Sequence, residues 1–347
     1  MDYQNPHQRV ILYYPKVLIN PGTWLKQALL YRDTVGSIVP YELDRRIINS
    51  PWIRELQDEG AFIPFRPEDI FNRNRNLGTA LIEEFREKVN SQQFQLYRNV
   101  GIGRAQHFDI YSEKIPGQLT AWLEDEELVQ RIDERRWRFE RHMGMLYMAL
   151  LAKYMADASQ FTTIPGSDYG LYKDLLFKSY NQENSDLGLS LRLKNILPTP
   201  RLDATLSDIL RFRRQRHDEL LAFRQEIDQF QSELKQAPNY PEVRDLTTRF
   251  SERFVRQVNN LYRVFDDGHI PFVLGTIENL IKVDTLPLIG LFSTQVQIPL
   301  GIQIAGAAAL GGITIRKYWL DHRNEERRIL QENSFSYLYL AQRQGII

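Results

Sequence analysis

Short apolar runs alternate with amphipathic stretches over the first third of the chain. The apolar runs are rich in β-branched and aromatic residues, which favours strands, whereas the longer stretches repeat their apolar residues at helical spacing. The expected strands cover residues 10–14, 37–39 and 61–65, and the expected helices cover 23–33, 43–58 and 79–89. Because strands and helices follow one another in turn, the pattern predicts a small α/β domain over residues 1–120.

The helical period dominates from Gly117 onward. The segment 144–158, GMLYMALLAKYMADA, is apolar on most of its faces and contains one Lys and one Asp. Its Met and aromatic residues would also suit a cofactor box, but an apolar helix of this kind is more often packed inside a protein. We therefore expect a buried helix within a helical core over residues 121–197.

A long segment with a coiled-coil spacing follows the turn at 197–200. Thr205 can cap a helix with Asp208 at the capping-box position, and the helical pattern continues to about residue 237. The apolar positions of this helix, spaced 3 and 4 residues apart, are Leu220, Phe223, Ile227, Phe230 and Leu234. A second helix carries Val243, Leu246, Phe250, Phe254, Val258, Leu261 and Phe265 on one side. Two such faces predict an antiparallel helical hairpin over residues 198–283.

The segment 285–315 has no charged residue, and its second half is rich in Gly and Ala. It is long enough to span a bilayer, and the sequence RKYW that follows it is typical of a membrane interface. However, its Ile and Leu residues favour insertion by only about 2 to 4 kcal/mol, and Pro299, Gln303 and the glycines oppose it. We favour a buried core or an oligomer interface over a membrane segment. The residues expected in that interface or membrane are Ile298, Gly301, Ala305, Gly306, Ala309, Gly312 and Trp319.

These elements predict an α+β fold that is predominantly α-helical. The expected order is a small α/β domain over 1–120, a helical core over 121–197 and a long antiparallel hairpin over 198–283. The last part, 284–347, joins the apolar Gly/Ala-rich segment to a C-terminal helix.

Composition narrows the classes of function. Lys and Arg number 44, as do Asp and Glu, so no net charge draws the whole chain to nucleic acid or membrane. The chain has no Cys, which excludes disulfides, thiolate catalysis and cysteine-based metal sites. No basic region followed by an apolar run opens the chain. We expect a cytoplasmic protein, with peripheral contact to the inner membrane as the alternative.

An arginine-rich stretch at 131–142, RIDERRWRFERH, is the first candidate binding site. Arg135, Trp137 and Arg138 combine guanidinium groups with an aromatic ring, a mixture that binds phosphates and stacks on bases. The acidic residues among them favour a solvated helix face with local ion pairs instead.

A second candidate lies where the apolar face of the first long helix, traced backwards from Leu220, meets Arg216 and Arg213. A charge on a buried face needs a partner. An antiparallel hairpin would bring Asp266 and Asp267 opposite Arg213. We favour a structural ion pair over an anion site.

Enzyme motifs are scarce. The chain has no phosphate-binding loop, nucleophile elbow or zinc motif, and we expect no metal and no cofactor. Asp109 and Glu113-Lys114 resemble the acidic-plus-lysine centres of metal-dependent nucleases, although their spacing is poor. Arg136 and His142 show the Arg-x5-His spacing that resembles the catalytic element of a helical, dimeric ribonuclease family.

Short motifs also connect the chain to an uncharacterised bacterial protein family. The motifs are YYP at 13–15, WxxxALLYxD at 24–33, SIVP at 37–40, LPxP at 197–200 and ILxFR at 209–213. With the Gly-rich apolar segment near the C-terminus, they resemble that family over the whole chain. The resemblance implies a bacterial origin, and the family brings no assigned activity or ligand.

We expect an interaction or regulatory protein rather than an enzyme. Such a protein would bind another protein or a second copy of itself within a bacterial defence or toxin-type assembly. One alternative is a membrane-acting effector that inserts residues 285–315. The other is the ribonuclease, for which RNA would be the partner.

Overall fold

The computed structural model describes residues 8–14, 16–43, 49–91, 94, 107–168, 199–236, 240–265 and 328–347. The chain divides into two compact units, which span residues 1–191 and 192–347.

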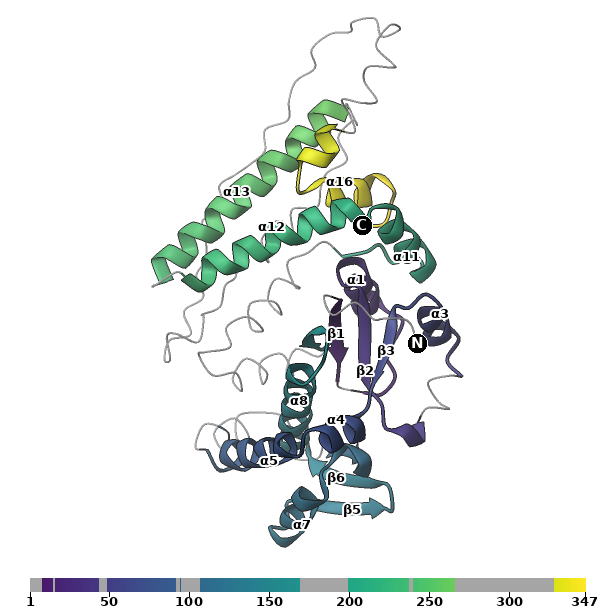
Figure 1. The fold of residues 1–347 in the computed structure, drawn as a ribbon, viewed down its shortest axis with the longest axis vertical. Helices are drawn as coiled ribbons and strands as arrows, with labels where there is room; N and C mark the ends of the chain where they lie inside the picture. Colours follow the sequence, from purple (N-terminus) through teal and green to yellow (C-terminus); the bar gives the residue numbers. More distant parts are fainter. Residues whose placement is uncertain are drawn as a thin grey trace, which may run out of the picture. The chain divides into compact units, whose positions relative to one another are not determined.

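Unit 1 contains a four-stranded parallel sheet with the order β3-β2-β1-β7 (Figure 1). Its strands are β1 (Arg9–Tyr13), β2 (Thr34–Ile38), β3 (Phe62–Phe65) and β7 (Thr162–Gly166). Val10 of β1 lies opposite both Thr34 of β2 and Thr163 of β7. Every residue of β2 and almost every residue of β1 is buried, as expected for parallel strands covered on both faces.

Helices α1 (Thr23–Tyr31) and α3 (Pro51–Asp58) lie between the first three strands in sequence. Pro51 begins α3 instead of interrupting a longer helix, because proline fits the first turn, where its missing N–H has no partner to lose. The helices α4 (Pro67–Arg73) and α5 (Arg75–Asn90) follow β3.

A second, antiparallel sheet in unit 1 has the order β4-β6-β5. It consists of β4 (His107–Tyr111), β5 (Val129–Asp133) and β6 (Arg136–Glu140), and α7 (Gly117–Asp125) precedes β5. The helix expected over residues 131–142 is therefore wrong, because this stretch forms a β-hairpin and the start of a helix. Buried and partly exposed side chains alternate along β6, as in a strand: Trp137 and Phe139 are buried, whereas Arg136 and Arg138 are partly exposed.

The helix α8 (Arg141–Asp157) forms the centre of unit 1 and packs against both sheets and α5. The Glu140 side chain caps it by accepting hydrogen bonds from the backbone N–H groups of His142 and Met143. Most of its residues are buried, which confirms the buried helix expected over 144–158.

Unit 2 is helical. It contains α11 (Leu206–Gln215), α12 (His217–Gln236), α13 (Tyr240–Phe265) and α16 (Ser336–Arg343). Thr205 and Asp208 form the expected capping box. The single helix expected to reach residue 237 is wrong, because it breaks at Arg216, where φ is −120° and ψ is 35°. The break lets Phe212 and Phe223 both approach the Tyr337 ring, at centroid distances of 5.1 and 6.2 Å.

Helices α12 and α13 lie side by side (Figure 1). Phe230 stacks on Phe250 at 4.1 Å, and Glu226 pairs with Arg253 at 2.6 Å. An earlier residue of α12 thus meets a later residue of α13, so the two helices run antiparallel.

The last residues of the chain complete the core of unit 2. The Phe335 side chain is fully buried, with its ring centroid 4.8 Å from that of Phe254 and 6.1 Å from that of Phe223. The following helix, α16, packs against α12 and α13.

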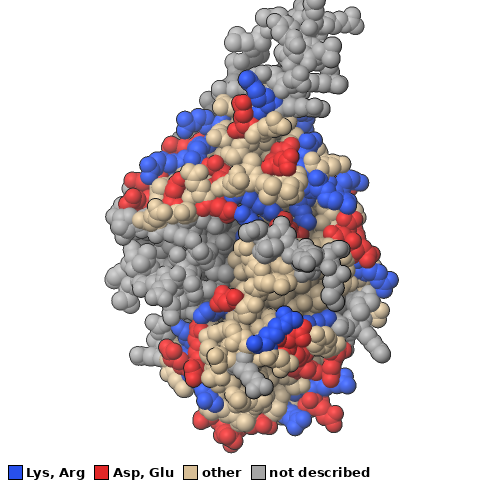
Figure 2. All heavy atoms as spheres, in the orientation of Figure 1, with Lys and Arg blue, Asp and Glu red and all other residues tan. Residues whose placement is uncertain are grey.

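The protein is therefore an α+β protein rich in helix, as predicted. On the face shown in Figure 2, basic and acidic side chains are interspersed over the described surface. The division into four parts at residues 120, 197 and 283 stays a prediction, and the segment 285–315 lies outside the described residues.

Candidate functional site

Two glutamates of unit 1 follow the carboxyl ends of neighbouring parallel strands. Glu42 lies in the 3-10 helix η1 (Tyr41–Leu43) shortly after β2, and Glu68 lies in the first turn of α4 directly after β3. Arg66 joins the two connections, because its Nη1 donates to the Val39 carbonyl at 2.8 Å and to the Pro40 carbonyl at 3.2 Å. The carboxyl ends of parallel strands are where α/β proteins usually bind ligands.

Glu113 and Lys114 come from the second sheet, in the 3-10 helix η2 (Ser112–Lys114) that follows β4. Helix α4 packs against η2, which brings Glu113 and Lys114 close to Glu68. The Lys114 backbone carbonyl accepts a hydrogen bond from the Tyr147 hydroxyl of α8. We call Glu42, Glu68, Glu113 and Lys114 the acidic cluster, whose members come from three separate segments, η1, α4 and η2.

Lys114 is the most deeply buried member, with 4% of its surface exposed. Burial lowers the pKa of its amine to about 7, although the charges of Glu113 and Glu68 act in the opposite direction. The lysine is therefore only partly protonated near neutral pH.

The pKa of the Glu113 carboxyl shifts in the opposite direction, upward. Burial raises the pKa of Glu113, and a backbone hydrogen bond partly opposes this shift. A hydrogen bond with Glu42 and the negative charges of Glu42 and Glu68 raise the pKa of Glu113 further. One carboxylate oxygen, Oε2, of Glu113 and of Glu68 is buried and accepts no hydrogen bond in the described part of the chain. A buried acceptor without a donor costs about 1 to 3 kcal/mol, so both oxygens favour a donor from outside.

A hollow of about 560 Å³ adjoins the cluster at Glu42. It is lined by Glu42, Leu43, Tyr111, Asp133, Glu134, Arg135 and Arg136, and we call it the hairpin hollow. Arg135 at the β5–β6 turn approaches Glu42 of η1, with 3.3 Å between Nε and Oε2. Glu42 thus belongs both to the hollow and to the acidic cluster.

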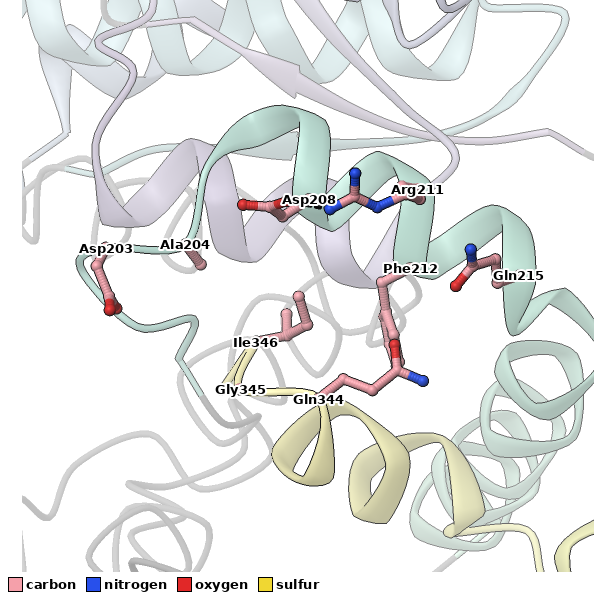
Figure 3. A pocket seen from close by; sticks show the side chains of 9 residues that line it. All are labelled: Asp203, Ala204, Asp208, Arg211, Phe212, Gln215, Gln344, Gly345 and Ile346. Atoms are coloured by element: carbon pink, nitrogen blue, oxygen red, sulfur yellow. Dashed lines mark hydrogen bonds and ion pairs between the residues drawn. The ribbon is translucent and has the colours of Figure 1, made fainter.

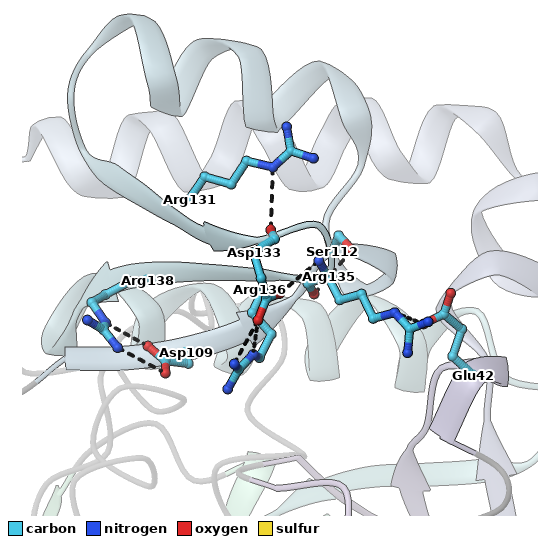
Figure 4. A network of polar contacts seen from close by, with 8 residues as sticks. All are labelled: Glu42, Asp109, Ser112, Arg131, Asp133, Arg135, Arg136 and Arg138. Carbon is cyan, nitrogen blue, oxygen red and sulfur yellow. Dashed lines mark hydrogen bonds and ion pairs between the residues drawn. The ribbon is translucent and has the colours of Figure 1, made fainter.

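Two further arginines of the hairpin, Arg136 and Arg138, have carboxylate partners on the same sheet. Arg136 pairs with Asp133 at 2.7 Å and lowers the pKa of that carboxyl, and Arg138 pairs with Asp109 at 3.0 Å (Figure 4). These pairs are exposed to solvent, where an ion pair contributes little to stability. Their role here is to leave the hollow with few uncompensated positive charges.

A family model described as a family of unknown function (DUF6236) matches residues 136–344. The chain belongs to this family. The match agrees with the resemblance to an uncharacterised family, and the DUF6236 region covers β6, α8, β7 and the described helices of unit 2. The acidic cluster lies before residue 136 and thus outside the match. No curated protein and no solved structure matches the chain.

The residues predicted to bind phosphate in this DUF6236 chain were Arg135, Trp137 and Arg138. Of these three, Arg135 lines the hairpin hollow. Trp137 is buried under the sheet, with the Arg131 guanidinium 5.7 Å from its ring centroid. Arg138 lies on the exposed face of the sheet with Asp109. Trp137 therefore presents little ring surface for stacking on a base.

The ribonuclease pair, Arg136 and His142, lies at opposite ends of β6. Four residues of strand separate Arg136 from Glu140 by about 13 Å. His142 is buried and its Nδ1 lies 2.9 Å from Glu140 Oε1, whereas Arg136 pairs with Asp133. The described geometry does not bring the two side chains together on one phosphate.

Arg213 and Arg216 lie at the junction of α11 and α12. Arg216 pairs with Glu219 at 3.5 Å. Burial raises the pKa of the Tyr337 hydroxyl, and the positive charge of the nearby Arg213 opposes this shift. The predicted partners Asp266 and Asp267 lie outside the described residues. The predicted ion pair between the two helices stays a prediction.

Unit 2 has a smaller hollow of about 300 Å³ between α11 and the C-terminal residues (Figure 3). Phe212 points toward Gln344 and Ile346 there, and the Arg211 side chain pairs with Asp208 at the rim. Both aspartates at the hollow already have an arginine partner, Arg211 for Asp208 and Arg201 for Asp203, which makes it a weaker candidate than the acidic cluster.

The predicted interface or membrane segment, which includes Ile298, Gly306 and Trp319, lies outside the described residues. Among the helices that the structure describes, none combines the length and apolar character needed to cross a bilayer. In the same described ranges, no group of three or more His, Asp or Glu side chains is arranged to hold a metal ion.

Sequence reasoning found only half of the acidic cluster. Glu113 and Lys114 were identified, together with Asp109, as resembling an acidic-plus-lysine centre. In the structure, Asp109 pairs with Arg138 instead. Glu42 and Glu68 were missed. Their position just after two predicted parallel strands was the signal that would have found them.

Proposed function

We propose that the protein is an interaction protein whose α/β unit binds a cationic group of a partner protein at the acidic cluster. The observation that carries the proposal is the pair of buried oxygens, Glu68 Oε2 and Glu113 Oε2, which lack a donor within the described residues. A Lys or Arg side chain of a partner would supply N–H donors and positive charge to both.

The charge balance supports a cationic partner group. Arg135 is engaged with Glu42, and Lys114 is only partly charged near neutral pH because its pKa is about 7. The three glutamates are therefore incompletely neutralised. A guanidinium or ammonium group entering the cluster would lower the pKa of Glu113 back toward its ordinary value.

The size of the adjoining hairpin hollow is consistent with a peptide segment. Its volume of about 560 Å³ falls within the range of ligand sites and accommodates a few side chains. The exposed charges around the hollow, Asp133, Glu134 and Arg136, would then favour partners whose flanking residues carry complementary charges.

The proposal predicts that a peptide rich in Lys and Arg binds the full-length protein, whereas a matched peptide rich in Asp and Glu does not. The variants Glu68→Gln and Glu113→Gln each remove one carboxylate charge with little change in shape, and each should weaken binding about tenfold or more. Fluorescence anisotropy with a labelled peptide measures the dissociation constants.

Glu124→Gln, on the exposed end of α7, is the matched control and should bind like the wild type. Equal binding of the basic and acidic peptides would contradict the proposal. So would a Glu113→Gln variant with unchanged affinity.

A further inference from the structure

An arginine-lined groove in unit 2 lies away from every residue discussed as a site above. It has a volume of about 490 Å³ and runs along α13, with one wall residue from α12. We call it the α13 groove, and its lining residues are Glu233, Leu246, Arg249, Phe250, Glu252, Arg253 and Arg256.

Three arginines follow one face of the helix. Arg249, Arg253 and Arg256 stand at positions i, i+4 and i+7, so they are neighbours on the helix surface over a rise of about 10 Å. Like charges at this spacing repel one another, and an anion bound between them would relieve the repulsion.

The central arginine is held in place. Arg253 Nη2 lies 2.6 Å from Glu226 Oε1, and its guanidinium is 5.6 Å from the centroid of the buried Phe250 ring. Arg249 and Arg256 on either side are exposed and form no ion pair with any residue that the structure describes. The groove therefore combines one anchored guanidinium with two that are accessible.

Guanidinium groups bind phosphate through two parallel N–H···O bonds, which makes phosphate the anion that fits this set best. Glu233 and Glu252 also line the groove and would repel a long polyanion, whereas the volume is that of a small-molecule site. We propose that the α13 groove binds a compact phosphate-bearing ligand, of nucleotide size or smaller, through Arg249 and Arg256.

The test is isothermal titration of the full-length protein with inorganic pyrophosphate, with ADP and, at matched ionic strength, with sulfate. Pyrophosphate or ADP should bind more tightly than sulfate. Arg249→Gln and Arg256→Gln should each weaken that binding about tenfold or more. Glu252→Gln removes a repulsive charge from the same groove and should tighten it.

Arg343→Gln, at the exposed C-terminal end of α16, is the matched control and should bind like the wild type. Arg249, Glu252, Arg256 and Arg343 are exposed, so thermal unfolding of these four variants should stay close to that of the wild type. The variant Glu113→Gln should retain phosphate binding, which separates this proposal from the one for the acidic cluster.

Three results would overturn the inference: no pyrophosphate or ADP binding above that of sulfate, an Arg256→Gln variant with unchanged affinity, or a Glu252→Gln variant that binds more weakly. Binding of a single-stranded oligonucleotide alone would also overturn it, because that surface would then be a nucleic-acid site.

Discussion

At the scale of single residues, Lys114 shows how position changes the chemistry of a side chain. An amine in water stays protonated to about pH 10, but burial of Lys114 brings its pKa to about 7. The folded protein therefore binds fewer protons at this site than the unfolded chain between about pH 7 and 10.5. Because the unfolded state binds more protons there, the contribution of Lys114 to the free energy of unfolding rises with pH across this window.

Replacing Lys114 by Met should therefore raise the free energy of unfolding near pH 7, since it removes a poorly solvated charge. The gain over the wild type should shrink as the pH approaches 10, where the wild-type amine is neutral in the folded protein. Urea unfolding at several pH values measures both.

Lys153→Met is the matched control, because Lys153 pairs with Glu84 at 2.9 Å. Its replacement should destabilise the protein near neutral pH instead of stabilising it. A Lys114→Met effect that does not change with pH would show that burial does not shift this amine.

At the scale of elements, unit 1 depends on the close approach of α8 to the second sheet. A Cβ atom at Gly144 would lie 2.9 Å from Phe108 Cβ and 3.1 Å from Phe139 Cβ, so the helix would have to move away from β4 and β6. Helix α8 also contacts β7 and β1, and through these contacts it couples the two sheets that bring the acidic cluster together.

Gly144→Ala should therefore destabilise the protein by about 1 to 3 kcal/mol, although alanine favours helices. Gly78→Ala on α5 is the matched control. A Cβ at Gly78 meets only Phe71, at 3.7 Å, so this change should stabilise by up to about 1 kcal/mol. Chemical denaturation measures both, and two changes of the same sign would contradict the packing argument.

At the scale of the whole molecule, charge is balanced. The formal net charge is zero and the isoelectric point of the sequence is about 7.0. With no net charge, molecules repel one another least, so any binding by charge must be local, as in the acidic cluster and the α13 groove.

Solubility should accordingly be lowest near pH 7 and rise on either side of it. Precipitation by polyethylene glycol at a series of pH values measures this, with ionic strength held constant. A solubility that falls steadily from pH 6 to pH 9 would contradict it.

Local patterns predicted a good part of the fold. The first three parallel strands, the buried α8 and the Thr205 capping box all follow from residue spacing, because periodicity reports which face of an element is buried. The β-hairpin at 129–140 was missed because its many charged residues suggested a solvated helix face, although apolar and charged residues alternate clearly along β6. The break at Arg216 was missed because neither Pro nor Gly marks it.

The sequence by itself determined the strand and helix periods, the α+β class, the balance of charge and the absence of thiol chemistry. Only the tertiary structure decided that β7 pairs with β1 and that Glu42, Glu68, Glu113 and Lys114 meet. Spacing along a chain reports local faces, whereas contacts between distant segments depend on how those faces pack. The pKa of Lys114 depends on burial in that packed structure, and the residue type alone does not encode it.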